Sequence, residues 1–154
     1  MRNPKKILII YHSQSTRTKL LADSVLKGVN TELNVETRMK VAFDANLDDL
    51  LWADSVIFGT PENFGYMSGA LKDFFDRTYY PAQKYQLSIP YAIFVSAGND
   101  GTNAAKEIDR IALGYPLKKV FDPVIVKGEI DESDKKRCEE LGSMISSATC
   151  QGII

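Results

Sequence analysis

The chain has 154 residues, of which 44% are hydrophobic and 25% are charged, and its formal net charge is −1. This size and composition predict one globular domain over residues 1–154. The balanced charge gives no indication of a nucleic-acid partner. No apolar run approaches the roughly 20 residues that span a bilayer, and the run 7–10 is too short for a signal-peptide core. We therefore expect a cytoplasmic protein with no nucleic-acid or membrane partner.

The residues that most often bind metals are widely separated. Cys138 and Cys150 form no CxxC pair, and the only histidine, His12, lies far from both in the sequence. This spacing predicts two reduced thiols, on the last helix and the tail, and no metal site.

Strand and helix patterns alternate along the chain. Continuous apolar runs predict strands buried on both faces, whereas residues 34–40 alternate and predict a strand near a sheet edge. We expect Pro81 to end the third helix and Gly114 and Pro116 to stop the fourth. In chain order the expected elements are a strand at 7–11, a helix at 16–29, a strand at 34–40, a helical turn at 47–52, a strand at 55–58, a helix from about 69 to about 79, a strand at 89–96, a helix at 104–112, a strand at 120–126, and a helix opening at Asp131 or Ser133.

This alternation predicts an α/β fold, with a parallel sheet and helices on both of its faces. In such sheets, ligands bind beyond the carboxyl ends of the strands. Residues 11–18, 59–69 and 96–103 follow three of the buried strands, and all three segments carry hydroxyls, other polar side chains or glycines. We expect these loops to converge on one ligand.

The first loop indicates a phosphate site. It opens a helix, whose first N–H groups are free and whose dipole favours an anion. A helix cap needs one hydroxyl, whereas this loop carries four, from Ser13, Ser15, Thr16 and Thr18.

Other phosphate-binding folds do not match this loop. Residues 11–18 contain no glycine, which excludes the dinucleotide-binding GxGxxG pattern and the P-loop. The strand ends in Tyr11 and His12, where a phospho-receiver domain would carry acidic residues. A phosphate monoester that is held and not transferred, such as the phosphate of FMN, fits best.

Two of the loops resemble those of a known family. Residues 13–18 (SQSTRT) resemble the phosphate loop of the flavodoxin-like FMN proteins. Residues 59–69 (GTPENFGYMSG) are similar to the flavin-ring loop of NAD(P)H:quinone oxidoreductases of the tryptophan-repressor-binding-protein type. The resemblance implies a flavodoxin-like three-layer αβα sandwich, a five-stranded parallel sheet of order 2-1-3-4-5, FMN as cofactor, and redox chemistry with NAD(P)H as a candidate electron donor.

The resemblance also assigns the candidate binding residues. It implies no catalytic acid or base and no metal ligand. Arg17 either pairs with the phosphate or points to solvent, and Glu62 either repels the reduced ring or is solvated. The phosphate is assigned to Ser13, Ser15, Thr16, Arg17 and Thr18, one edge and face of the ring to Thr60, Pro61, Glu62, Asn63, Phe64, Gly65 and Tyr66, and the other edge to Ser96, Ala97, Gly98, Asn99 and Gly101.

Three departures from the family pattern keep alternatives open. Thr16 replaces the usual glycine, which is tolerable if Thr16 keeps helical backbone angles. Residues 96–101 lack the aromatic residue that flavodoxins stack on the outer ring face. The short connection 41–46 lacks the insertion of the quinone reductases, whose neighbouring subunits complete the substrate pocket in a homo-oligomer.

These features support three hypotheses. The first is an FMN-dependent enzyme that uses NAD(P)H to reduce a quinone, a flavin or a similar small-molecule acceptor. The second is a flavodoxin-type carrier that passes electrons between protein partners. The third is a non-enzymatic binding or regulatory domain that binds FMN poorly.

Overall fold

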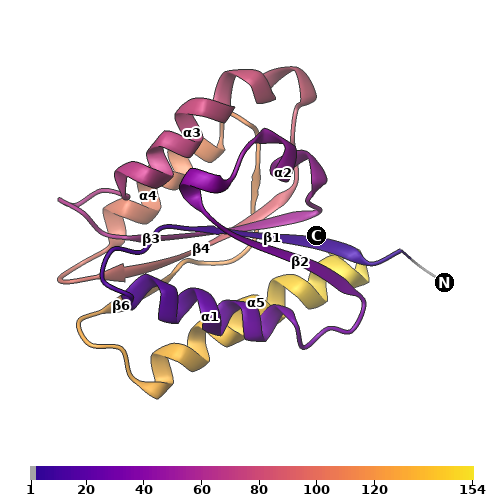
Figure 1. Ribbon diagram of the computed structural model, residues 1–154. Coiled ribbons are helices and arrows are strands. Elements are labelled where there is room, and N and C mark those ends of the chain that lie inside the picture. Colours follow the sequence, from indigo (N-terminus) through magenta and orange to yellow (C-terminus); the bar gives the residue numbers. More distant parts are fainter. Residues whose placement is uncertain (1–2) are drawn as a thin grey trace.

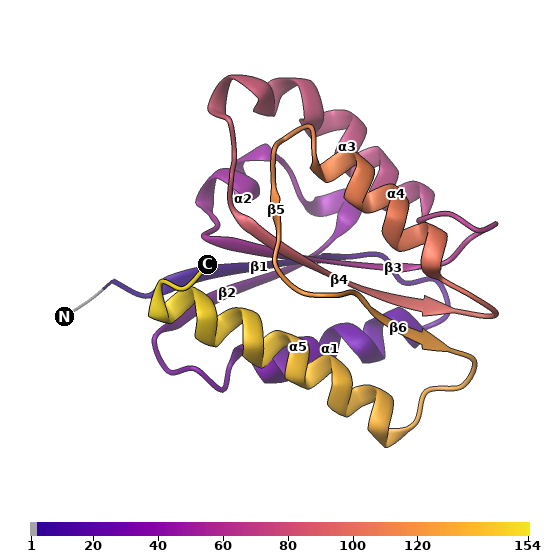
Figure 2. The same ribbon diagram turned by 180° about the vertical axis from the view of Figure 1, so that it is seen from behind.

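The computed structural model describes residues 3–154 and shows one sheet between two layers of helices (Figures 1 and 2). Two 3₁₀ turns, η1 (Ala42–Asp44) and η2 (Gln83–Tyr85), follow β2 and α3. The strands and α-helices are β1 (Lys5–Tyr11), α1 (Arg17–Val29), β2 (Val35–Val41), α2 (Leu47–Trp52), β3 (Ser55–Pro61), α3 (Gly69–Ala82), β4 (Pro90–Ala97), α4 (Thr102–Ala112), β5 (Lys118–Lys119), β6 (Val124–Lys127) and α5 (Glu132–Gln151).

The sheet has the strand order β2-β1-β3-β4-β5, and its pairings are parallel. The predicted order 2-1-3-4-5 is therefore confirmed. The expected last strand at 120–126 is wrong in detail, because the position beside β4 is shared by two short strands, β5 and β6. Pro123, between them, has no N–H to donate to β4, so the ladder is interrupted there.

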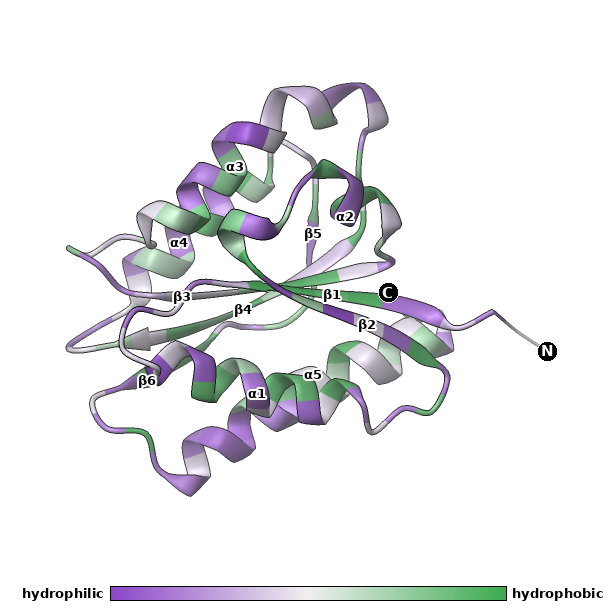
Figure 3. Ribbon diagram, in the orientation of Figure 1, coloured by the Kyte–Doolittle hydropathy of each residue, from purple (hydrophilic) through white to green (hydrophobic). Residues whose placement is uncertain are grey.

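Each face of the sheet is covered by its own helices. Helices α1 and α5 cover one face, and α2, α3 and α4 cover the other (Figure 1). Along β1, Ile7 and Ile9 pack toward α1 and α5, whereas Leu8 and Ile10 pack toward α3 and its neighbours. Both sides of the central strands are thus buried, which explains their unbroken apolar sequences, seen as green strands in Figure 3.

Two helix ends refine the expectations. Asp131 is the N-cap of α5 and accepts a hydrogen bond from the N–H of Asp134 at 2.9 Å, which decides between the two predicted starts. Pro81, by contrast, does not end α3, which continues to Ala82. Pro81 lies in the last turn, where its missing N–H removes a single helical hydrogen bond and the chain can still enter η2.

Both cysteines lie on α5 as free thiols. Burial raises the pKa of the Cys138 thiol to about 12, so this thiol stays protonated at neutral pH. Within residues 3–154, no cluster of three His, Cys, Asp or Glu side chains is arranged to hold a metal ion. In the same range, no helix has the length and apolar character needed to cross a membrane.

Candidate functional site

Three loops meet at one end of the sheet. They follow the carboxyl ends of β1, β3 and β4, which are neighbours in the sheet. In Figure 1 they lie together at the left, and both chain ends lie at the right. The predicted convergence of residues 11–18, 59–69 and 96–103 is therefore found in the fold.

The first loop is bonded to each of the other two. The Asn63 amide donates to Gln14 Oε1 at 2.8 Å, which joins the first loop to the second. The buried hydroxyls of Thr18 and Ser96 lie 2.7 Å apart and join the first loop to the third. Thr18 and Ser96 thus hold the site together through their hydroxyls. Gln14 was not among the predicted site residues, because the prediction for this loop rested on its hydroxyls.

The second and third loops are joined by backbone and side-chain bonds. The N–H of Glu62 donates to the Ser96 carbonyl at 2.9 Å, and one Glu62 carboxylate oxygen accepts from the N–H of Gly101 at 2.6 Å. The Asn103 amide donates to the Gly65 carbonyl at 2.5 Å. Glu62 therefore anchors a loop, a role outside both sequence interpretations. Asn103, which was not among the predicted site residues, bridges the second and third loops.

Free donors gather at the start of α1. The described residues offer no acceptor to the N–H groups of Ser15, Thr16, Arg17 and Thr18. Ser13 Oγ accepts from the N–H of Lys19 at 3.1 Å, and the side chains of Ser15 and Thr16 are exposed. We call residues 13–18 the cradle.

The backbone of the cradle fits a phosphate. Thr16 has φ 69° and ψ −13°, in the left-handed region, immediately before the helical residue Arg17. A left-handed residue beside a right-handed one turns successive N–H groups toward one point and makes an anion-binding concavity. Thr16 therefore does not keep the helical angles considered in the sequence analysis. It takes the conformation that explains why the family favours glycine there.

Arg17 is directed away from bulk solvent. Its guanidinium donates to the carbonyl of Gly128, in the turn between β6 and α5. This contact ties the first turn of α1 to the turn after β6, and the backbone N–H of Arg17 stays available to a ligand.

The second loop forms a tight turn with an exposed tip. Asn63 and Tyr66 exchange backbone bonds of 2.8 and 2.9 Å, and Phe64 and Gly65 both have positive φ. The Phe64 ring is fully exposed, so its contact with a flavin ring stays a prediction. Thr60 is buried and accepts from the N–H of Ser68 at 2.9 Å, so its hydroxyl shapes the loop.

The third loop offers mostly backbone to a ligand. Ser96 and Ala97 are buried at the end of β4, whereas Gly98 and Asn99 are exposed. Gly101 has φ 85°, and a Cβ on it would lie 2.7 Å from Ile125 Cγ2, so a side chain is excluded there. At exposed Gly98, by contrast, a Cβ would meet no atom within 4 Å, so the backbone of the loop is open to a ligand there.

His12 and Phe43 flank the first loop. Their rings meet edge-on with centroids 6.2 Å apart. Burial lowers the pKa of His12, so its imidazole is neutral at pH 7. Phe43 comes from η1 and is exposed, and no sequence signal marked it because the connection 41–46 has no pattern.

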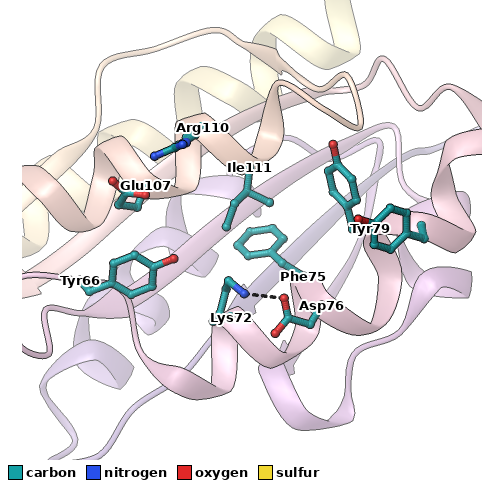
Figure 4. A pocket seen from close by; sticks show the side chains of 9 residues that line it. Tyr66, Lys72, Phe75, Asp76, Tyr79, Glu107, Arg110 and Ile111 are labelled. Atoms are coloured by element: carbon teal, nitrogen blue, oxygen red, sulfur yellow. Dashed lines mark hydrogen bonds and ion pairs between the residues drawn. The ribbon is translucent and has the colours of Figure 1, made fainter.

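A separate groove of about 470 Å³ lies between α3 and α4. Figure 4 shows the Tyr66 side chain at this groove, near the Lys72–Asp76 ion pair of 2.5 Å. Tyr66 therefore directs its side chain to the groove, and its contact with a flavin ring stays a prediction.

Comparisons with known proteins identify the family of this chain. Residues 12–122 match the family model described as NADPH-dependent FMN reductase. The flavodoxin of Aquifex aeolicus (strain VF5) is 38% identical over 71 residues, 46% of this chain and 38% of that protein. The quinone-oxidoreductase QR2 of Triphysaria versicolor is 31% identical over 117 residues, 62% of this chain and 57% of that protein.

The fold is also shared with solved structures. A flavodoxin from the domain Archaea superposes with a TM-score of 0.83 at 24% identity, covering 94% of this chain and 99% of that one. This likeness confirms the flavodoxin-like fold. The chain spans 38% and 57% of the length of the two curated relatives above.

Proposed function

The chain belongs to the NADPH-dependent FMN reductase family, and we propose that it is a single flavodoxin-like domain acting as an FMN-dependent NAD(P)H oxidoreductase. The family match and the flavodoxin relative confirm the predicted cofactor, FMN. We propose a quinone, a flavin or a similar small molecule as the electron acceptor, and a location in the cytoplasm.

The cradle is the observation that carries this proposal. Its free N–H groups and exposed hydroxyls suit the phosphate of FMN, with each hydrogen bond to a charged group worth about 1.5–3 kcal/mol. The proposed phosphate ligands are the backbone N–H groups of residues 15–18 and the hydroxyls of Ser13 and Ser15, whereas the Thr16 hydroxyl donates to the Ser15 carbonyl.

The remaining two loops suit the flat ring. The backbone from Pro61 to Gly65 and from Ala97 to Asn99 lies at the carboxyl ends of adjacent strands, beside the cradle. Bound FMN supplies hydride and single-electron transfer, so this chain needs to bind and orient the ring and the second substrate. Neutral His12 at the edge of the cradle adds no charge near the phosphate.

The third loop favours an enzyme over a carrier. Residues 96–101 carry no aromatic side chain, and exposed Gly98 and Asn99 leave room for a nicotinamide or a quinone to stack. Hydride transfer requires an approach of about 3–3.5 Å, which a bare ring face permits. A redox substrate or an electron-transfer partner fits the family, and a homo-oligomer is a further proposal taken from the quinone reductases.

The electron-carrier alternative rests on a specific similarity. The flavodoxin of Aquifex aeolicus matches 46% of this chain. The connection from β2 to α2 holds only η1, without the longer insertion expected of quinone reductases. Under this alternative, the exposed face of the flavin ring would meet a partner protein and not a small molecule.

One experiment separates the two functions. We expect the FMN-loaded protein to be yellow, with absorbance near about 450 nm, and to oxidise NADPH or NADH when a soluble benzoquinone is present. Absence of turnover with both nicotinamides would exclude the enzyme, and reduction by a ferredoxin-type protein donor alone would favour the carrier.

A measurement of FMN affinity tests the cradle. Ser15→Asp places a carboxylate against the phosphate, so we expect FMN affinity to fall by at least about 100-fold. Ser133→Asp is the matched control, because Ser133 is an exposed serine in the first turn of another helix, α5. Unchanged FMN affinity in Ser15→Asp would place the phosphate elsewhere.

A further inference from the structure

Glu62 is bonded to both ends of the third loop. It directly follows β3, and its backbone N–H donates to the Ser96 carbonyl at 2.9 Å. Its carboxylate accepts from the N–H of Gly101 at 2.6 Å. Glu62 therefore bonds to the third loop at both ends, at Ser96 near the end of β4 and at Gly101 just before α4.

The carboxylate also completes a helix end. Gly101 is the N-cap of α4 and has no side chain with which to cap it. The N-terminus of a helix carries partial positive charge, so a carboxylate from another loop is a favourable partner there. The Glu62 carboxylate thus accepts from the N–H of the cap residue itself, while the Asp100 carboxylate accepts from the next N–H, that of Thr102, at 3.2 Å.

Gly101 has little freedom to take another position. Its φ is 85°, and its Cα faces Ile125 Cγ2 and the Cβ of Ala97 so closely that an added Cβ would lie 2.7 and 3.0 Å from them. On the far side of the loop, the N–H of Gly128 donates to the Ala97 carbonyl at 2.9 Å. Between these anchors, Gly98 and Asn99 are exposed, so their backbone conformation depends on how the two ends of the third loop are held.

We propose that Glu62 is a positioning residue, whose carboxylate holds the backbone of residues 97–101 in the conformation that receives the ring of FMN. This proposal rests on the proposed assignment of these loops to the ring. The N–H bond to Ser96 is independent of the side chain, so the carboxylate contributes the bond to Gly101 and its charge.

Two substitutions separate the bond from the charge. Glu62→Ala removes both, whereas Glu62→Gln keeps an oxygen that accepts from Gly101 and removes the charge. The control is Glu129→Ala, which removes an exposed carboxylate from the turn after β6, outside the three loops.

The readouts are amide hydrogen exchange and FMN affinity on the full chain. In Glu62→Ala without FMN, we expect exchange of the Gly101 amide to rise about tenfold or more, with the Phe94 amide of β4 as reference for global unfolding. FMN affinity, measured by fluorescence quenching, should fall about tenfold. Glu62→Gln should return both quantities to within about threefold of the wild type.

Specific results would overturn the proposal. One is unchanged exchange at Gly101 or unchanged FMN affinity in Glu62→Ala. Another is equal loss of FMN affinity in both variants, which would make the charge, and not the position of the loop, the determinant. A wild type that binds no FMN would refute the proposed ring site, and the exchange at Gly101 would then still report whether the carboxylate holds the loop.

Discussion

Two of the non-glycine residues with positive φ lie in the ligand loops. Thr16 has φ 69° in the cradle, and Phe64 has φ 53° in the turn of the second loop. A left-handed conformation costs about 1–3 kcal/mol for a residue other than glycine, and such residues cluster at functional sites. The structure thus concentrates backbone strain where the chain must present N–H groups or a tight turn to a ligand.

Thr16 provides a direct test of this strain. We expect Thr16→Gly to raise the melting temperature by roughly 2–4 °C, because relief of the left-handed conformation outweighs the entropy of glycine by about 1 kcal/mol. FMN affinity should be retained, since the free N–H groups remain. The control is Ser15→Gly, which should lower the melting temperature because Ser15 is not among the residues with positive φ. A lower melting temperature in Thr16→Gly would show that the left-handed backbone of Thr16 is not strained.

At the scale of elements, α1 and α5 pack with their backbones in contact. A Cβ on Gly28 would lie 1.8 Å from the Glu139 carbonyl oxygen, and one on Gly142 would lie 2.1 Å from the Val25 carbonyl oxygen. The Ser146 hydroxyl also donates to the Val29 carbonyl at 2.8 Å. Because α1 begins at the cradle, this close packing on α5 positions the N–H groups that we propose for the phosphate.

The glycines of this helix pair predict a large effect of one methyl group. Gly28→Ala forces a Cβ into a backbone carbonyl, so we expect a loss of about 2–3 kcal/mol in the free energy of unfolding, measured by urea denaturation. Gly69→Ala is the control, since a Cβ there meets no atom within 4 Å. If both variants were equally stable, the two helices would not pack as described.

At the scale of the whole molecule, one buried carboxylate ties the edge of the sheet to a helix. Asp49 of α2 is 2% exposed and lies 2.9 Å from Lys40 and 3.1 Å from Arg38, both of β2. Burial by itself raises the pKa of Asp49, but the bonds from Lys40, the Asn46 N–H and Arg38 lower it overall. The charged form is therefore the one that the folded protein favours.

This lowered pKa predicts a contribution to acid unfolding. A group with a lower pKa in the folded state stabilises the protein above its unfolded pKa and loses that contribution as the pH falls through the folded pKa. We therefore expect Asp49→Asn to lose less unfolding free energy than the wild type between about pH 6 and pH 3. Urea titrations across this range measure the slopes. Asp48→Asn, at an exposed neighbour in the same turn, should parallel the wild type, and a parallel Asp49→Asn would refute the assignment.

Patterns that are local in the sequence sufficed to predict the alternation of strands and helices, the parallel sheet and the three loops at its end, whereas the order of the strands was predicted from the family resemblance. Apolar runs, helical spacing and breaker residues each act over a few neighbouring residues, so they can be read without the fold. The hydroxyls of the first loop indicated a phosphate, and the resemblance of residues 13–18 and 59–69 to the loops of a known family identified FMN.

Only the tertiary structure decided how the residues of the site act. Thr18 bonds to Ser96 and Glu62 to Gly101, across 78 and 39 positions of the chain, and such contacts depend on how the layers pack. The same holds for the left-handed Thr16, for the division of the last strand into β5 and β6, and for α3 continuing past Pro81. Local secondary-structure propensity contributes less than tertiary packing to the conformation that a residue adopts. The sequence thus determined which loops meet. The packing of the layers decided which of their N–H groups and side chains bond to one another and which remain available to the proposed cofactor.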